Sequence, residues 1–150
     1  MNLSPNFVLA EFVTSQEATR QGIDNTPPEA IITRLSALCM NILEPLRHAL
    51  GPVRISSGYR CPALNAAIGG ARCSQHMEGR AADISVNGRD LDDVYNWTYD
   101  NAPFDQVIRE FPPGGWAHVS YDPGRNRRDG LLATRGPDGR TAYTHIGRLA

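Results

Sequence analysis

Two histidines and an aspartate have the residue types and the spacing of a metal site. His76 and Asp83 stand seven positions apart in the segment Ser74–Asp83, and His118 lies in the apolar run Trp116–Tyr121. Two imidazole nitrogens and one carboxylate oxygen form a three-ligand set that leaves a zinc ion one open coordination position, as catalytic zinc sites require. The set therefore predicts a catalytic zinc site.

Each of these residues alone has an ordinary structural explanation, so only the set carries the prediction. A single histidine is usually a core or surface residue, and Asp83 alone could accept hydrogen bonds in a turn. Gly79 lies between His76 and Asp83 and would let that loop turn tightly enough for both side chains to face one ion. Asp83 and His118 would be held rigidly if strands carried them.

The first fifty residues have the pattern of helices. Residues 4–21 mix apolar and polar positions as one or two short helices do. From Glu29 to Leu50 the apolar residues recur at helical spacing, which predicts the longest helix of the chain. Pro45 should kink that helix or end its first part, because proline cannot donate the hydrogen bond of a helix interior.

Most of the elements after residue 52 are predicted to be strands. Short apolar stretches bounded by glycine and proline are typical of strands, and Pro112–Gly115 is typical of a hairpin turn. Helices that precede strands favour an α+β fold in which N-terminal helices pack on an antiparallel sheet. The elements predicted are strands at 53–57 and 81–86, short helices at 61–68 and 90–99, a hairpin of strands 104–111 and 116–121, and a weaker hairpin of strands 131–134 and 141–146.

The length of 150 residues fits a single domain. We divide it into a helical part at about 1–50, a catalytic core at about 53–121 and a C-terminal β extension at about 122–150. No apolar run approaches the roughly 18–20 residues that cross a bilayer. The N-terminus has no basic region followed by a hydrophobic segment, so no secretory signal is predicted. We therefore expect a monomer that is made in the cytoplasm and does not insert into membranes.

The charge distribution gives no support for nucleic-acid binding. The net charge is −1, all 15 basic residues are arginine, and the dense basic patch is Arg125–Arg128. A nucleic-acid-binding domain is expected to have a basic face. We interpret the patch as a solvated loop, with contact to a phosphate or to a wall polymer as the alternative.

The three cysteines lack the spacing of a cysteine-based zinc site. Cys39 falls in the apolar pattern of the long predicted helix and is expected to be buried. Cys61 and Cys73 flank one short segment, so both a disulfide and two free thiols remain open, although cytoplasmic thiols usually stay reduced.

Three sequence blocks follow one another within residues 53–121. They are Ser56-Ser57-Gly58-Tyr59-Arg60, Ser74-Gln75-His76 with Gly79, Ala81 and Asp83, and Trp116-Ala117-His118-Val119-Ser120. Together they resemble the zinc D-alanyl-D-alanine carboxypeptidase family, whose superfamily includes lysostaphin-like endopeptidases and the hedgehog signalling domain. The resemblance implies a hedgehog/D-Ala-D-Ala peptidase-like fold, one zinc ion, and peptidoglycan stem peptides as partners. The zinc ligands that it implies are His76, Asp83 and His118.

The resemblance also implies residues that contact the substrate. Arg60 matches the position that binds a carbonyl or carboxylate of the substrate, and its planar guanidinium suits two parallel hydrogen bonds. The alternative for Arg60 is a structural arginine at a strand end. Ser74 would either donate to the substrate or hold its loop, and Trp116 would either stack on the substrate or pack in the core.

The general base is where the sequence departs from the family pattern. Better-known relatives have a glutamate three residues before the last histidine or a histidine two residues before it, and here those positions hold Gly115 and Trp116. Glu110 is the expected base if it shares a face of the predicted hairpin with His118; otherwise it is an exposed charge at a strand end. The weaker candidates for the base are Asp105 and Glu78.

We expect the chain to be a zinc-dependent peptidase that hydrolyses peptide bonds next to D-alanine in bacterial peptidoglycan, as a carboxypeptidase or as a cross-link endopeptidase. The missing signal sequence fits a phage or prophage protein that reaches the cell wall after release or within a virion. The alternative is a zinc-binding module of the same fold that has no base and serves as a cell-wall-binding or virion structural component.

Overall fold

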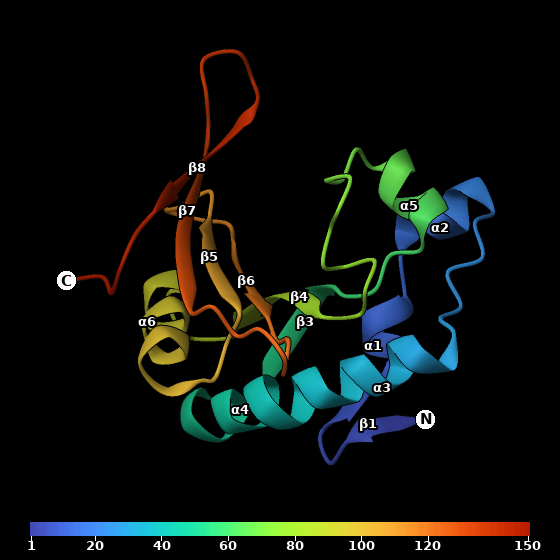
Figure 1. The fold of residues 1–150 in the computed structure, drawn as a ribbon, viewed down its shortest axis with the longest axis horizontal. Coiled ribbons are helices and arrows are strands. Elements are labelled where there is room, and N and C mark those ends of the chain that lie inside the picture. The colour runs from blue at the N-terminus through green and yellow to red at the C-terminus, as the bar shows by residue number, and fades with distance from the viewer.

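A six-stranded sheet with the order β3-β4-β6-β5-β7-β8 is the centre of the fold (Figure 1). The computed structural model describes residues 1–150, and the predicted α+β class is confirmed. Both predicted hairpins are present, as β5–β6 and β7–β8. The strands are β3 (Val53–Ser57), β4 (Ala81–Val86), β5 (Gln106–Glu110), β6 (Trp116–Ser120), β7 (Asp129–Arg135) and β8 (Thr141–His145).

The helices lie where the sequence predicts them, mostly in the N-terminal third. They are α1 (Leu9–Val13), α2 (Gln16–Gln21), α3 (Glu29–Leu38), the π-helical turn η1 (Cys39–Leu43), α4 (Glu44–Leu50), α5 (Pro62–Ala67) and α6 (Leu91–Asn101). A small sheet of β1 (Asn2–Ser4) and β2 (Phe7–Val8) was not predicted. No helix combines the length and the apolar content that a membrane span requires.

One strand pair departs from the predicted antiparallel sheet, because β5 and β7 run parallel. After β6 the chain passes to the far side of β5 before it re-enters the sheet, and this crossover makes the sheet mixed. Two arginines of the basic patch hold the crossover to the protein. Arg127 Nε donates to Asp105 Oδ1 at 2.8 Å, and Arg128 Nη1 donates to the carbonyl oxygen of Ala102 at 2.7 Å.

The long predicted helix runs without interruption from Glu29 to Leu50 through α3, η1 and α4. Pro45 cannot donate to the carbonyl oxygen of Asn41, and the wider π turn Cys39–Leu43 comes directly before it. The predicted irregularity at Pro45 therefore takes the form of a π turn within one helix. The apolar stripe of the helix is buried in the core and consists of Ile31, Leu35, Leu38, Cys39, Ile42, Leu43 and Leu46.

The cysteines are free thiols in the structure. Cys39 is fully buried, as predicted, and burial raises the pKa of its thiol to about 12. Cys61 precedes α5, and its Sγ accepts a hydrogen bond from the backbone N–H of Leu64 at 3.5 Å. Cys73 is exposed. Because both Cys61 and Cys73 are free, the structure shows two thiols rather than the alternative disulfide.

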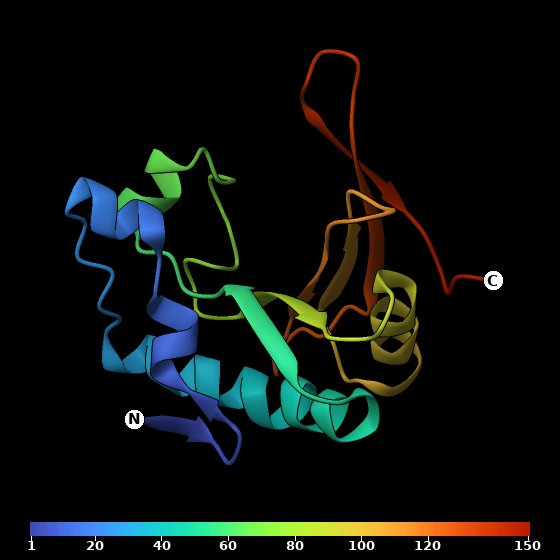
Figure 2. The ribbon, with the colours of Figure 1, turned by 180° about the vertical axis from the view of Figure 1, so that it is seen from behind.

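The two faces of the sheet have different roles. Alternate residues of a strand point to opposite faces, and Ala82, Ile84, Ala117 and Val119 join the buried core with the long helix and α6. The intervening positions of the same strands, including Asp83 and His118, therefore lie on the outer face. In both ribbon views, α1, α2 and α5 lie on the opposite side of the molecule from β7 and β8 (Figure 1, Figure 2).

Candidate metal centre

The structure brings His76, Asp83 and His118 together on the outer face of the sheet, and each is at least nine-tenths buried. Asp83 Oδ1 lies 3.3 Å from His76 Nε2 and 3.2 Å from His118 Nδ1. Ligand atoms bound at about 2.0–2.2 Å to a tetrahedral ion lie roughly 3.3–3.6 Å apart. These two separations match those of atoms that share one zinc ion, and ligand atoms of all three residues lie within 4.8 Å of one another.

The loop that carries His76 is tied to the segment after β3. His76 Nδ1 donates to the carbonyl oxygen of Gly58 at 2.7 Å, which leaves Nε2 with the lone pair that faces Asp83. Position 58 has to be glycine, because a Cβ there would lie 2.6 Å from the carbonyl oxygen of Phe12. Gly79 has a φ of +70° in the turn before β4, as the predicted tight turn requires.

Adjacent strands hold the other two residues opposite each other, because Asp83 of β4 pairs with His118 of β6. Burial raises the pKa of the Asp83 carboxyl, but its interactions with His118 and His76 outweigh burial and hold that pKa well below its usual range. Asp83 is therefore a carboxylate near neutral pH, which is the form that binds metals. His118 Nε2 is buried and makes no hydrogen bond. The donor set fits a zinc ion.

These residues open into a cleft of about 580 Å³. One side is the segment from Gly69 to His76, and the other is the outer face of the sheet from β4 to β8. The predicted site residues that line it are Arg60, Ser74, His76, Asp83, Glu110, Trp116 and His118. All the residues that the sequence predicts for the metal, the base and the substrate therefore share one cleft.

Arg60 is held at the edge of the cleft, so the structural and the substrate-binding alternatives are compatible. Its Nε donates to Ser57 Oγ at 3.2 Å and its Nη1 donates to Asn65 Oδ1 at 3.3 Å. Its Nη2 lies 3.6 Å from Asp83 Oδ2. These contacts fix the guanidinium beside the metal ligands, where a substrate carboxylate or carbonyl can approach it.

Glu110 meets the condition set for it as a base. In the β5–β6 hairpin Ile108 pairs with His118 and Glu110 pairs with Trp116, so Glu110 and His118 share a face. Burial, and then the negative charge of Asp83, raise the pKa of Glu110 to about 7. A carboxyl group with a pKa near neutrality can both accept and return a proton.

The other two carboxylate candidates have different surroundings. Asp105 is fully buried, accepts hydrogen bonds from Arg127 and Gln75, and does not line the cleft. Glu78 is exposed and forms an ion pair with Arg80 at 3.0 Å. Of the three predicted candidates, only Glu110 lines the cleft.

The turn between β5 and β6 explains why no carboxylate occupies position 115. Gly115 has a φ of +74°, and a Cβ there would lie 1.8 Å from the carbonyl oxygen of Glu110. This turn excludes any side chain at that position. On the opposite strand, Glu110 lines the cleft.

Ser74 and Trp116 retain both of their predicted alternatives. Ser74 Oγ accepts a hydrogen bond from the backbone N–H of His76 at 3.2 Å, which holds the loop, and Ser74 also lines the cleft. The Trp116 ring packs edge-on against Phe111 with 5.6 Å between ring centroids. Its Nε1 is buried without a partner, so the indole has a free donor beside Glu110.

Sequence reasoning did not identify the contribution of the C-terminal β extension. Tyr143 and His145 of β8 and Asp129 and Leu131 of β7 line the same cleft. His145 is exposed, and its Nδ1 lies 2.8 Å from Asp129 Oδ1. The sequence predicts the hairpin of β7 and β8, but it does not show that β7 pairs with β5.

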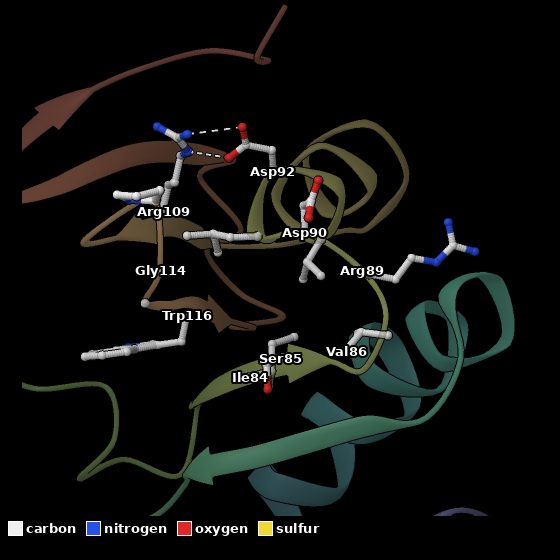
Figure 3. A pocket seen from close by; sticks show the side chains of 13 residues that line it. Ile84, Ser85, Val86, Arg89, Asp90, Asp92, Arg109, Gly114 and Trp116 are labelled. Atoms are coloured by element: carbon white, nitrogen blue, oxygen red, sulfur yellow. Dashed lines mark hydrogen bonds and ion pairs between the residues drawn. The ribbon is translucent and has the colours of Figure 1, made fainter.

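A second cavity, of about 500 Å³, lies between the end of β4, the start of α6 and the β5–β6 turn (Figure 3). The charged pair of Arg109 and Asp92 closes one side of it, with Nε–Oδ1 and Nη2–Oδ2 distances of 2.6 and 3.1 Å. No histidine lines this cavity. The chemistry therefore places the candidate site in the cleft of the metal ligands.

The raised pKa of Glu110 predicts a pH-dependent difference in stability for the ion-free protein. A carboxyl group whose folded pKa of about 7 exceeds its ordinary value of 4.5 stabilises the fold below about pH 4.5, and that contribution is lost as the pH rises through 7. In chelator, Glu110→Gln should therefore have a higher Tm than wild type at pH 8 and nearly the same Tm at pH 4. Thermal unfolding at the two pH values tests this, and an equal Tm difference at both would contradict it.

Comparison with known proteins agrees with this geometry. The sequence profile of the family described as peptidase M15 matches residues 5–120. The zinc D-Ala-D-Ala carboxypeptidase of Streptomyces albus G is 39% identical over 49 residues, which are 31% of this chain and 19% of that relative. The alignment thus spans about a fifth of the relative's length. Because the family match covers well over half of the chain, the protein belongs to the peptidase M15 family of metallopeptidases.

Proposed function

We propose that this chain is a zinc-dependent peptidase that hydrolyses peptide bonds next to D-alanine in bacterial peptidoglycan. The observation that carries the proposal is the convergence, in one cleft, of a three-residue ligand set, a carboxylate and a guanidinium. Metallopeptidases require these three functions: a metal site with an open position, a base, and a group that holds the substrate.

His76, Asp83 and His118 would hold the zinc ion, with His76 binding through Nε2. Zinc supplies Lewis acidity, which lowers the pKa of water and polarises a peptide carbonyl. The hydrogen bond from His76 Nδ1 to the Gly58 carbonyl orients the imidazole before any ion arrives.

Glu110 would be the general base and then the general acid. Its carboxylate accepts a proton from the attacking water as the new C–O bond forms, and it returns that proton to the leaving nitrogen as the C–N bond breaks. One water molecule is thereby added across the peptide bond, and Glu110 ends as it began. Its position on the face of His118 supports this role.

Arg60 would bind the substrate on the side of the metal ligands away from Glu110. A guanidinium can form two parallel hydrogen bonds with a terminal D-alanine carboxylate or can hold a peptide carbonyl. Ser74 and Trp116 line the same cleft as Arg60 and Glu110 and would contact the same substrate.

The substrate class is inferred from the relative named as a zinc D-Ala-D-Ala carboxypeptidase. D-alanine occurs at the ends and at the cross-links of peptidoglycan stem peptides, so the cell wall would be the site of action. A phage or prophage lysis protein or virion component of this kind remains our proposal for its biological setting.

Purified sacculi provide the direct test. Wild-type protein supplied with zinc should release new amino groups from sacculi, a chelator should abolish the release, and added zinc should restore it. Mass spectrometry of the products then distinguishes a carboxypeptidase, which releases free D-alanine, from an endopeptidase, which divides cross-linked muropeptides. If zinc-loaded protein binds sacculi and releases nothing, the alternative of a non-catalytic cell-wall-binding or virion module replaces this proposal.

A further inference from the structure

We propose that the C-terminal hairpin, β7 and β8, is a substrate-binding wall, and that Tyr143 on it determines which stem peptides are bound. The hairpin would contact the acyl side of the substrate, on the side of the metal ligands away from Arg60. The inference rests on the proposed function, because it places that function's substrate. β7 and β8 lie beyond residue 120, where the family match ends.

Strand register places the hairpin residues on the catalytic face. Residues that pair across strands share a face of the sheet. One row of paired residues joins the expected base to Tyr143, and the next row joins a metal ligand to His145. The first row is Trp116, Glu110, Ala133 and Tyr143, and the second is His118, Ile108, Leu131 and His145.

The space between these rows has an apolar floor. Ile108, Leu131 and Ala133 form a small buried cluster that is separate from the main core. Ile108 and Leu131 line the cleft, whereas Ala133 is fully buried in the row between Glu110 and Tyr143. Such a floor fits the methyl or methylene groups of a stem-peptide residue, because buried apolar contact stabilises the complex.

Tyr143 has the position and the chemistry to hold a peptide. Its side chain lines the cleft, yet Tyr143 is 58% exposed, which is unusual for so large an apolar surface. Burial, and then the charges of Glu110 and Asp83, raise the pKa of Tyr143, so its hydroxyl remains a donor. A tyrosine in this place can pack its ring on an aliphatic side chain and donate to a peptide carbonyl.

The hairpin is also fixed relative to the base. The backbone N–H of Phe111, next to Glu110, donates to the carbonyl oxygen of Ala133 at 2.9 Å. The Arg135 guanidinium of β7 lies over the Phe111 ring, 4.9 Å from its centroid. The wall and the base therefore form one unit, and a substrate residue held by Tyr143 keeps a constant position relative to Glu110. Figure 1 shows this hairpin on the other side of the molecule from α5, which precedes the opposite wall.

Binding of two ligands tests the inference. The probes are N-acetylmuramoyl tetrapeptide, a reaction product that keeps the acyl side of the stem, and N-acetyl-D-alanine, a substrate fragment with only an acetyl group in place of the stem. Calorimetry with zinc-loaded protein measures each Kd. Tyr143→Ala should weaken tetrapeptide binding about tenfold, a loss that corresponds to about 1.4 kcal/mol, and should leave N-acetyl-D-alanine binding unchanged. Tyr143→Phe should show a smaller loss, which reports the hydroxyl.

Thr144→Ala is the matched control, because Thr144 is an exposed neighbour on the same strand whose side chain points to the opposite face. It should bind both ligands as wild type does. Equal tetrapeptide affinity for wild type and Tyr143→Ala, or equal losses for both ligands, would overturn the hairpin inference alone. A wild-type protein that neither binds nor cleaves stem peptides would overturn the proposed function as well.

Discussion

Replacing Glu110 with glutamine is expected to lower kcat on peptidoglycan by about 10²–10⁴-fold, the usual contribution of a general base. Glutamine has the shape of glutamate, so it keeps the packing at the end of β5 but cannot accept the proton of the attacking water. Zinc content should stay at the wild-type level, because Glu110 is not in the ligand set. Amine release from sacculi and elemental analysis of the same samples measure the two effects.

Glu78→Gln is the matched control for that experiment. Glu78 was a weaker candidate for the base, and it is an exposed carboxylate paired with Arg80. Its variant should hydrolyse sacculi at the wild-type rate. If Glu110→Gln is as active as wild type, the base is another group and the role given to Glu110 is wrong.

Much of the candidate site could be predicted because it depends on local patterns. The sequence predicts the strands that carry Asp83 and His118 and the hairpin that joins β5 to β6. It leaves open the register that puts Glu110 and His118 on one face. Gly79 correctly indicated the tight turn that follows His76. These are local features, whereas the pairing of Asp83 with His118 joins β4 and β6, which α6 and β5 separate in the sequence.

The features that escaped prediction depend on contacts between distant segments. Nothing local to residues 129–135 indicates that they pair in parallel with β5, because that pairing depends on the crossover held by Arg127 and Arg128. Without it, Tyr143 and His145 cannot be placed near the metal ligands. The C-terminal extension could thus be recognised as a hairpin but not as a wall of the cleft.

The displaced base shows how one turn changes the interpretation of a motif. Gly115 occupies the position where better-known relatives carry a glutamate, and by itself this argues against catalysis. The structure gives a steric reason for the glycine, since its Cβ would collide with the carbonyl oxygen of Glu110. Glu110 is the last residue of β5, directly before this turn, and it pairs with Trp116 on the face of His118. The same hairpin therefore leaves no room for a carboxylate at position 115 and places one at position 110.

Zinc binding should disappear when a ligand is removed, and this is the second large effect that we expect. Wild type should contain about one zinc ion per chain, and His76→Ala should contain less than roughly a tenth of that, because two ligands hold the ion far less tightly than three. Zinc at about a thousand times its Kd stabilises a folded protein by about 4 kcal/mol. For a chain of this size that corresponds to a rise in Tm on the order of 10 °C, which His76→Ala should not show.

His48→Ala provides the control, because His48 is exposed on α4, far from the cleft residues in the fold. It should bind zinc and gain thermal stability as wild type does. Since Tm and elemental analysis do not depend on turnover, they test the ligand set even if the substrate proposal fails. Equal zinc content in wild type and His76→Ala would show that the ion binds elsewhere. The close contacts of Asp83 with both histidines would then be a buried ion-pair network, whose role would be structural.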